Sequence, residues 1–151
     1  MEKMIKFQME KRFRLYTDGC SKGNPGIAAG GIVIVSPDDK IILQKKIFIG
    51  NNFTNNEAEY ISLLEGIVTA QKKGIKNIII SSDSQLVLRQ IKGEYKVKKS
   101  HLKIFHKKIM DRLKNFDSYK IEEVYRTHKY IKIADSLANE KVDEINKKHF
   151  I

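Results

Sequence analysis

A short apolar run at residues 76–82, KNIIISS, is the feature that most restricts what this chain can fold into. Three successive isoleucines without polar alternation are typical of a strand buried in a parallel sheet. Apolar residues recur at helical spacing over residues 55–74, and a second helical pattern starts at about Ser84. A strand enclosed by two helices indicates a crossover unit, and therefore an α/β fold.

Other segments supply the remaining strands and helices of this fold. Three earlier apolar runs are separated by Gly, Pro and SPDD turn signals and predict an antiparallel meander at residues 13–17, 28–36 and 40–50. Later segments predict a lysine-rich helical region within residues 93–116, an alternating strand at 119–127 and an amphipathic helix at 133–145. The result is a mixed sheet with helices packed on it.

The length of 151 residues is that of one domain, and no repeat or low-complexity linker divides the chain. We expect a single domain over residues 12–151 that acts as a monomer. Residues 1–11 form an N-terminal extension, which either lengthens the first strand or is disordered.

The chain is strongly basic, with 29 Lys and Arg against 18 Asp and Glu and a formal net charge of +11. This excess favours a polyanionic partner, nucleic acid or an anionic membrane surface; a basic protein without such a partner is the alternative. A single cysteine, Cys20, excludes an internal disulfide and a Cys-rich zinc site. No stretch approaches ~20 apolar residues, so we expect a cytoplasmic chain without a membrane partner.

Four acids lie where this fold would bring them together. Asp18 and Asp83 each follow a predicted strand, Glu59 lies in the first turns of a helix, and Asp135 starts the last helix. Ligand crevices form at the carboxyl ends of strands in sheets with parallel pairs. A carboxylate cluster needs bound cations or protons, and Mg²⁺ prefers oxygen ligands. Two ions about 4 Å apart support phosphodiester cleavage.

Each acid also has an ordinary structural interpretation. Asp18 precedes a glycine, a common turn dipeptide, and Asp83 is placed to cap the helix that follows it. Glu59 fits a solvated helix face, while Asp135 complements the dipole of the last helix. Only the combination of the four favours a functional site.

In chain order, the segments that carry these acids resemble the motifs of the type I ribonuclease H family. The four segments are YTDGCSKGNPG at residues 16–26, TNNEAEY at 54–60, SSDSQLV at 81–87 and ADSLANE at 134–140. The resemblance extends over about residues 12 to 140. It implies the ribonuclease H-like α/β fold, a five-stranded mixed sheet of three antiparallel and two parallel strands with helices on both faces.

The resemblance implies an endoribonuclease that hydrolyses the RNA strand of RNA/DNA hybrids and leaves a 3′-hydroxyl and a 5′-phosphate. Its metal-binding and catalytic acids would be Asp18, Glu59, Asp83 and Asp135, with two Mg²⁺ or Mn²⁺ ions bound together with the substrate. Glu57 is a nearby competitor, but Glu59 matches the helix acid of the family.

Contacts to the hybrid are also implied by the resemblance, from Asn24, Asn55, Asn56 and Gln85. Neutral amides both donate and accept hydrogen bonds, so they can meet 2′-hydroxyls and base edges without reading one sequence. Gly23 would let the loop backbone approach the sugar and phosphate, although a plain turn explains it equally well.

Lysines crowd the segment after residue 91, and we take Lys96, Lys98 and Lys99 as contacts to substrate phosphates. A solvated helix face is the alternative. His128 lies seven residues before Asp135, where the family carries a histidine or a flexible loop, and Ile131 replaces the family's asparagine. His128 either transfers a proton and assists product release or is a surface histidine.

Three other functions remain open. The altered segment before Asp135 is compatible with an inactive or weak nucleic-acid-binding module, although an unused acid cluster would repel itself. The sequence resembles a compact form of the family, with neither the basic protrusion nor the N-terminal hybrid-binding domain of longer relatives. This form has no obvious device that demands a DNA strand, so double-stranded RNA is a second possible substrate. A DNA recombinase or junction-resolving nuclease shares the acids but gives no reason for amides that face a 2′-hydroxyl.

Overall fold

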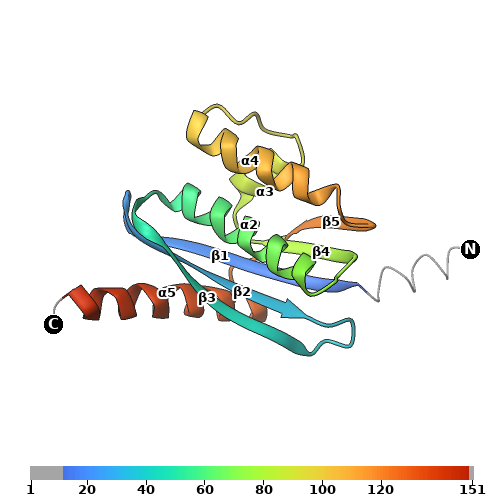
Figure 1. Ribbon diagram of the computed structural model, residues 1–151, viewed down its shortest axis with the longest axis horizontal. Helices are drawn as coiled ribbons and strands as arrows, with labels where there is room; N and C mark the ends of the chain where they lie inside the picture. Colours follow the sequence, from blue (N-terminus) through green and yellow to red (C-terminus); the bar gives the residue numbers. More distant parts are fainter. Residues whose placement is uncertain (1–11, 150–151) are drawn as a thin grey trace, which may run out of the picture.

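The computed structural model describes residues 12–149, and its strands and helices follow the predicted order (Figure 1). In chain order they are β1 (Phe13–Gly23), β2 (Gly26–Val35), β3 (Ile41–Phe53), α2 (Asn55–Lys72), β4 (Asn77–Ser82), α3 (Gln85–Ile91), α4 (Ser100–Leu113), β5 (Ser118–Glu123) and α5 (Lys129–His149). The expected N-terminal extension lies outside the described residues.

The five strands form one mixed sheet of order β3-β2-β1-β4-β5. Strand β2 pairs antiparallel with β1 and β3, whereas β4 pairs parallel with β1 and with β5. The predicted meander followed by parallel strands is therefore confirmed. The crossover through α2 places β4 beside β1, so β1 is the strand at which the sheet changes from antiparallel to parallel pairing.

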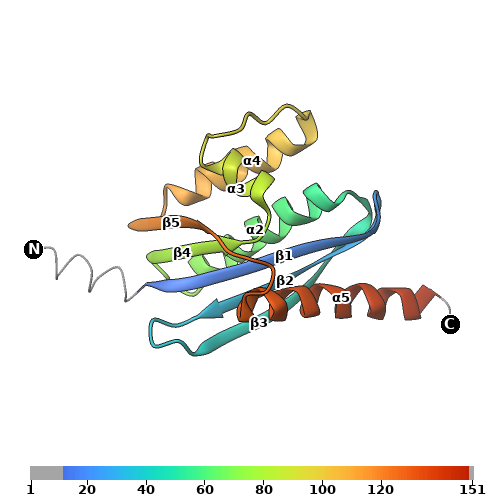
Figure 2. The same ribbon diagram turned by 180° about the vertical axis from the view of Figure 1, so that it is seen from behind.

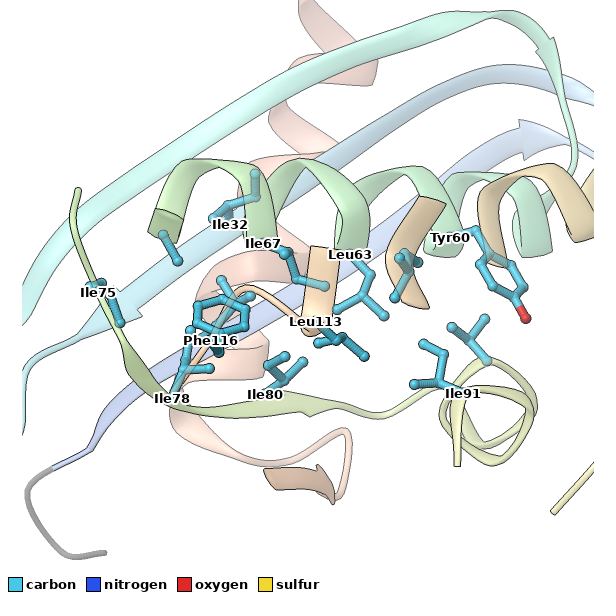
Figure 3. Packing of buried hydrophobic residues seen from close by; sticks show 14 of the residues in the cluster. Ile32, Tyr60, Leu63, Ile67, Ile75, Ile78, Ile80, Ile91, Leu113 and Phe116 are labelled. Atoms are coloured by element: carbon cyan, nitrogen blue, oxygen red, sulfur yellow. The ribbon is translucent and has the colours of Figure 1, made fainter. Parts of the chain in front are cut away.

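Helices cover both faces of the sheet, as predicted (Figures 1 and 2). Alternate residues of β1 point to opposite faces: Leu15 joins the core beneath α2 and α4, and Tyr16 packs against Tyr130 and Ile131 of α5. Figure 3 shows the larger core, in which Leu63 and other side chains of α2 meet the isoleucines of β4. Within residues 12–149, no helix has the length and apolarity needed to cross a bilayer.

Strand β1 and helix α5 are among the elements that are longer than the sequence predicted. Strand β1 continues past residue 17 to Gly23, because β2 pairs with it through the hairpin end, where Gly23 meets Gly26. Helix α5 begins at Lys129 rather than at residue 133, and its extra turn carries Tyr130 and Ile131 into the core. Both extensions bear on the placement of the acids.

Candidate active site

The acids gather where β1 and β4 separate. Pairing between these strands is confined to residues 13–16 of β1, although β1 itself continues to Gly23. Asp18 therefore lies in the middle of its strand but beyond the last contact with β4, and Asp83 directly follows the end of β4. The two strands separate at the carboxyl end of β4, the location at which ligand sites form in such sheets.

Three carboxylates meet where the two strands separate. One oxygen from each of Asp18, Glu59 and Asp83 lies within 4.8 Å of the other two. Asp18 is only 6% exposed, and Glu59 and Asp83 are half-buried. The three residues come from β1, from α2 and from the loop after β4, so the sheet and one helix are both needed to assemble the group.

Asp135 of α5 adds a fourth carboxylate from the opposite face of the sheet. The protonated carboxyl of Asp18 donates a hydrogen bond to Asp135, which helps to raise the pKa of Asp18. Asn139, one turn further along α5, donates through Nδ2 to Asp135 Oδ1 at 3.2 Å. The structure thus brings together all four acids that the sequence singled out.

Glycines let both helices approach the sheet closely enough for this arrangement. A Cβ on Gly19 would overlap the backbone of Ala58 in α2, and a Cβ on Gly31 would overlap the backbone of Ala134 in α5. The residue after each of these alanines is one of the acids, Glu59 or Asp135. Direct backbone packing therefore fixes the position of both carboxylates relative to Asp18.

Burial and mutual repulsion hold the cluster partly protonated when no cation is bound. Burial, followed by the charge of Glu59, raises the pKa of Asp18 to about 10. Burial and Asp83 likewise raise the pKa of Glu59 to about 8, against lowering by the Asp18 hydrogen bond, the Gly19 amide and Arg126. Carboxyl groups that lose their protons with difficulty when no cation is bound, and that offer only oxygen ligands, fit hard divalent cations such as Mg²⁺ or Mn²⁺.

Two reactive side chains near the acids, Glu57 and Cys20, do not belong to the acid cluster. Glu57 and Thr54 form a capping box at the start of α2, with the Glu57 amide donating to Thr54 Oγ1 at 3.1 Å and the Thr54 amide to Glu57 Oε1 at 3.0 Å. Glu57 is thereby occupied outside the acid cluster. Burial, with the charges of Asp18 and Asp135, raises the pKa of Cys20 to about 11, so this thiol remains protonated.

A cavity of about 480 Å³ adjoins the start of α2 and contains most of the predicted amide contacts. Its lining comprises Asn24, Thr54, Asn55, Asn56, Lys99, His101 and Leu102. The Asn55 amide donates to Asn24 Oδ1 at 3.1 Å, and the Ser21 amide donates to Asn55 Oδ1 at 2.9 Å. Gly23 has a φ of 97°, which glycine adopts readily, and it closes this loop.

The predicted phosphate contacts border a second cavity of about 510 Å³. Its lining comprises Asn56, Leu86, Gln90, Glu94, Tyr95, Lys96, Lys98, Lys99 and Leu102. Asn56 and Lys99 belong to both cavities, so the amides and the lysines lie along one continuous surface. Gln85 is exposed on the first turn of α3 and is not part of either lining.

His128 lies directly before α5 and helps to begin that helix. The Tyr130 amide donates to His128 Nδ1 at 3.2 Å, and the imidazole stacks on Tyr16 with a centroid separation of 4.9 Å. Burial and then the charges of Lys129 and Arg14 lower the pKa of His128. The neutral ring therefore acts as a cap through Nδ1, which leaves Nε2 for other contacts.

Arg126 is a residue that sequence reasoning missed. It lies in the loop between β5 and α5, and its charge lowers the pKa of Glu59. An isolated arginine in a loop carries no periodic or motif signal, so only the fold reveals this relationship.

A sheet of order β3-β2-β1-β4-β5, with four acids where β1 and β4 separate, defines an α/β protein of the ribonuclease H-like fold. A family described as reverse transcriptase-like matches residues 16–141. Ribonuclease HI of Halobacterium salinarum is 38% identical over 133 residues, which are 88% of this chain and 65% of that protein. The chain belongs to the type I ribonuclease H family.

Solved structures agree with this assignment. RNase H1 from Halobacterium salinarum has a TM-score of 0.84 at 37% identity, covering 88% of this chain and 98% of that one. The N-terminal RNase H domain of a Mycobacterium tuberculosis protein has a TM-score of 0.85 at 32% identity, covering 91% and 98%. LC11-RNase H1, solved in complex with an RNA/DNA hybrid, has a TM-score of 0.82 at 30% identity, covering 89% and 99%.

The chain covers only part of several relatives. It spans 65% of the length of the Halobacterium ribonuclease HI and 34% of the length of a bifunctional protein of Mycobacterium tuberculosis.

Proposed function

We propose that this chain is an endoribonuclease that hydrolyses the RNA strand of RNA/DNA hybrids and leaves a 3′-hydroxyl and a 5′-phosphate. The observation that carries the proposal is the approach of Asp18, Glu59 and Asp83 to within 4.8 Å, with Asp135 beside Asp18. Carboxylates buried together in a chain of net charge +11 serve no evident stabilising purpose, because their repulsion raises their pKa values.

Asp18, Glu59, Asp83 and Asp135 would hold two Mg²⁺ or Mn²⁺ ions. When bound, such ions supply the positive charge that stabilises a phosphodiester displacement. The chain itself contributes by holding these carboxylates in position. Residues of β1 both before and after Asp18 are paired with β2. The helix backbones next to Glu59 and Asp135 pack directly on glycines of the sheet. The carboxylates therefore have little freedom to move.

The asparagine-lined cavity at the start of α2 supports a hybrid as the substrate. Asn24, Asn55 and Asn56 present donors and acceptors suited to 2′-hydroxyls and base edges, and Lys96, Lys98 and Lys99 add charge for phosphates. A relative 30% identical to this chain, LC11-RNase H1, was solved with an RNA/DNA hybrid. Gln85, exposed at the start of α3 and next to Leu86 of the larger cavity, is proposed as a further contact to the hybrid.

His128 is proposed to transfer a proton or to assist product release through Nε2. Its ring lies on Tyr16, two residues before Asp18 on β1. The lowered pKa keeps the imidazole mostly neutral near neutral pH, with Nδ1 accepting from the Tyr130 amide, so a proton would be exchanged at Nε2.

The decisive experiment compares cleavage of end-labelled RNA/DNA hybrid, double-stranded RNA and double-stranded DNA in Mg²⁺, Mn²⁺ or EDTA. We expect wild type to cut only the RNA of the hybrid with metal present, and Asp18→Asn and Glu59→Gln to be inactive. Glu57→Gln is the matched control: it removes a carboxylate two residues from Glu59 but keeps a side chain able to complete the capping box.

Each alternative predicts a different result in this assay. Cutting of double-stranded RNA at a similar rate would broaden the substrate class. Hybrid binding without cutting in either metal would instead support an inactive binding module.

A further inference from the structure

The connection between α3 and α4, residues 92–99, is a basic segment. It contains Lys92, Lys96, Lys98 and Lys99, and every residue except the half-buried Val97 is exposed. The amides of Glu94 and Tyr95 bond to the Arg89 carbonyl at 2.9 and 3.2 Å, which secures the first half of the segment. The second half carries Lys96, Lys98 and Lys99, which line the cavity of about 510 Å³.

Gln90 joins this second half to the interior. Its side chain is only 6% exposed, and its Nε2 donates to the Lys96 carbonyl at 3.3 Å. Its Oε1 accepts a hydrogen bond from the hydroxyl of Tyr60, a wholly buried residue of α2. His106 of α4 donates through Nε2 to the Gln90 backbone carbonyl at 3.1 Å. One glutamine thus links α2, the basic segment and α4.

The direction of the Gln90 amide depends on Tyr60. A tyrosine hydroxyl bound to Oε1 leaves the NH₂ group of the amide to face the opposite side, where the Lys96 carbonyl lies. Figure 3 shows the Tyr60 ring extending from α2 towards the helix that carries Ile91. Tyr60 directly follows Glu59, so the link starts beside one of the site acids.

We propose that Gln90 is a positioning residue for substrate: with Tyr60, it fixes the basic segment against α2 so that its lysines and Asn56 border one groove. Gln90, Asn56 and Lys96 all line the same cavity of about 510 Å³. Release of the segment would displace the lysines and leave the acids, which belong to other elements, in place. The inference rests on the proposed function, because it assigns these lysines to the nucleic acid.

Gln90→Met tests this role, since it keeps the length of the side chain and removes both hydrogen bonds. We expect the KM for hybrid to rise about fivefold or more, as for a broken hydrogen bond that leaves buried partners unsatisfied, with kcat within about twofold. Trypsin should also cleave faster after Lys96, Lys98 and Lys99, measured by mass spectrometry well below the melting temperature. Tyr60→Phe should have the same effects, because it removes the group that orients the amide.

Gln71→Met is the matched control. Gln71 also joins α2 to α4, by donating through Nε2 to the Arg112 carbonyl at 2.7 Å, but it lies at the other end of α2. The Gln71→Met variant should leave the KM for hybrid and the tryptic cleavage of residues 92–99 unchanged.

Trypsin susceptibility and hybrid affinity in EDTA require no catalysis, so they test the role of Gln90 even if wild type cuts nothing. Unchanged affinity and unchanged tryptic cleavage in a folded Gln90→Met protein would overturn the proposal. If that variant does not fold, the same two measurements on Tyr60→Phe decide it.

Discussion

Gly31 of β2 lies directly against the backbone of Ala134 in α5, so that no side chain fits between the strand and the helix. The next residue of α5 is Asp135. A contact between two backbones, on the face of the sheet opposite α2, therefore determines where the fourth carboxylate lies.

Replacing Gly31 by alanine should displace α5 and with it Asp135. We expect a stability loss of about 1–3 kcal/mol from overpacking. Cleavage should fall at least tenfold at temperatures where the variant is folded, because carboxylate placement is sensitive to small shifts. Gly50→Ala is the control, since its Cβ would meet only the side chain of Phe53, which can move. Full activity in a folded Gly31→Ala protein would disprove the dependence.

Metal-free protein should become less stable as the pH rises from about 5 to 8. The folded-state pKa values of Asp18 and Glu59 are raised, so the unfolded chain loses these protons first and the free energy of unfolding falls with rising pH. Thermal melts in EDTA at both pH values measure the fall, which Glu59→Gln should reduce. Mg²⁺ should stabilise wild type more at pH 8 than at pH 5; equal stabilisation would contradict competition between metal and protons.

The two roles of His128 can be separated by comparing alanine with asparagine. Asparagine is a good N-cap and retains part of the stability that alanine loses, about 1 kcal/mol for the cap. Neither replacement has an Nε2 atom, so kcat should fall about tenfold or more in both if this atom transfers a proton. Thermal melts and single-turnover rates give the two quantities. A normal kcat in His128→Asn would restrict the residue to capping α5 and stacking on Tyr16.

Lysines of the basic segment should determine the salt dependence of hybrid binding. Changing Lys96, Lys98 and Lys99 to glutamine should make the slope of log K against log salt shallower by about 0.7–0.9 for each phosphate that the protein no longer neutralises. Titrations in EDTA at several salt concentrations measure the slope. The control changes Lys72, Lys73 and Lys76, three exposed lysines near the other end of α2, and alters the net charge equally. Equal slopes for both triple variants would indicate a general charge effect.

The sequence predicted the order of strands and helices along the chain and the meeting of the four acids, because both depend on local patterns. Apolar runs mark the strands, and each acid lies in a short motif beside a predicted strand or helix. Pairing was harder to foresee: Asp18 lies within β1, not at its end, because the polar residues up to Gly23 pair with β2. Such pairing is a tertiary effect with no apolar signal of its own.

Relationships between distant side chains were beyond the reach of sequence patterns. Gln90 is an ordinary polar residue in a short helix until the fold places Tyr60 and Lys96 on either side of it. His128 likewise gave no sign of its stacking on Tyr16, because the pairing of these rings depends on where α5 crosses β1. Such roles arise from the packing of elements that are remote in the chain.

The docking of α5 also has a consequence for biosynthesis. Asp18, Glu59 and Asp83 are all translated well before Asp135, and the helix that carries Asp135 packs last in chain order onto β2. A nascent chain that has not yet released this helix from the ribosome lacks the fourth carboxylate and the covering of one face of its sheet. The order of synthesis therefore delays completion of the acid cluster until α5 has left the ribosome and packed on β2.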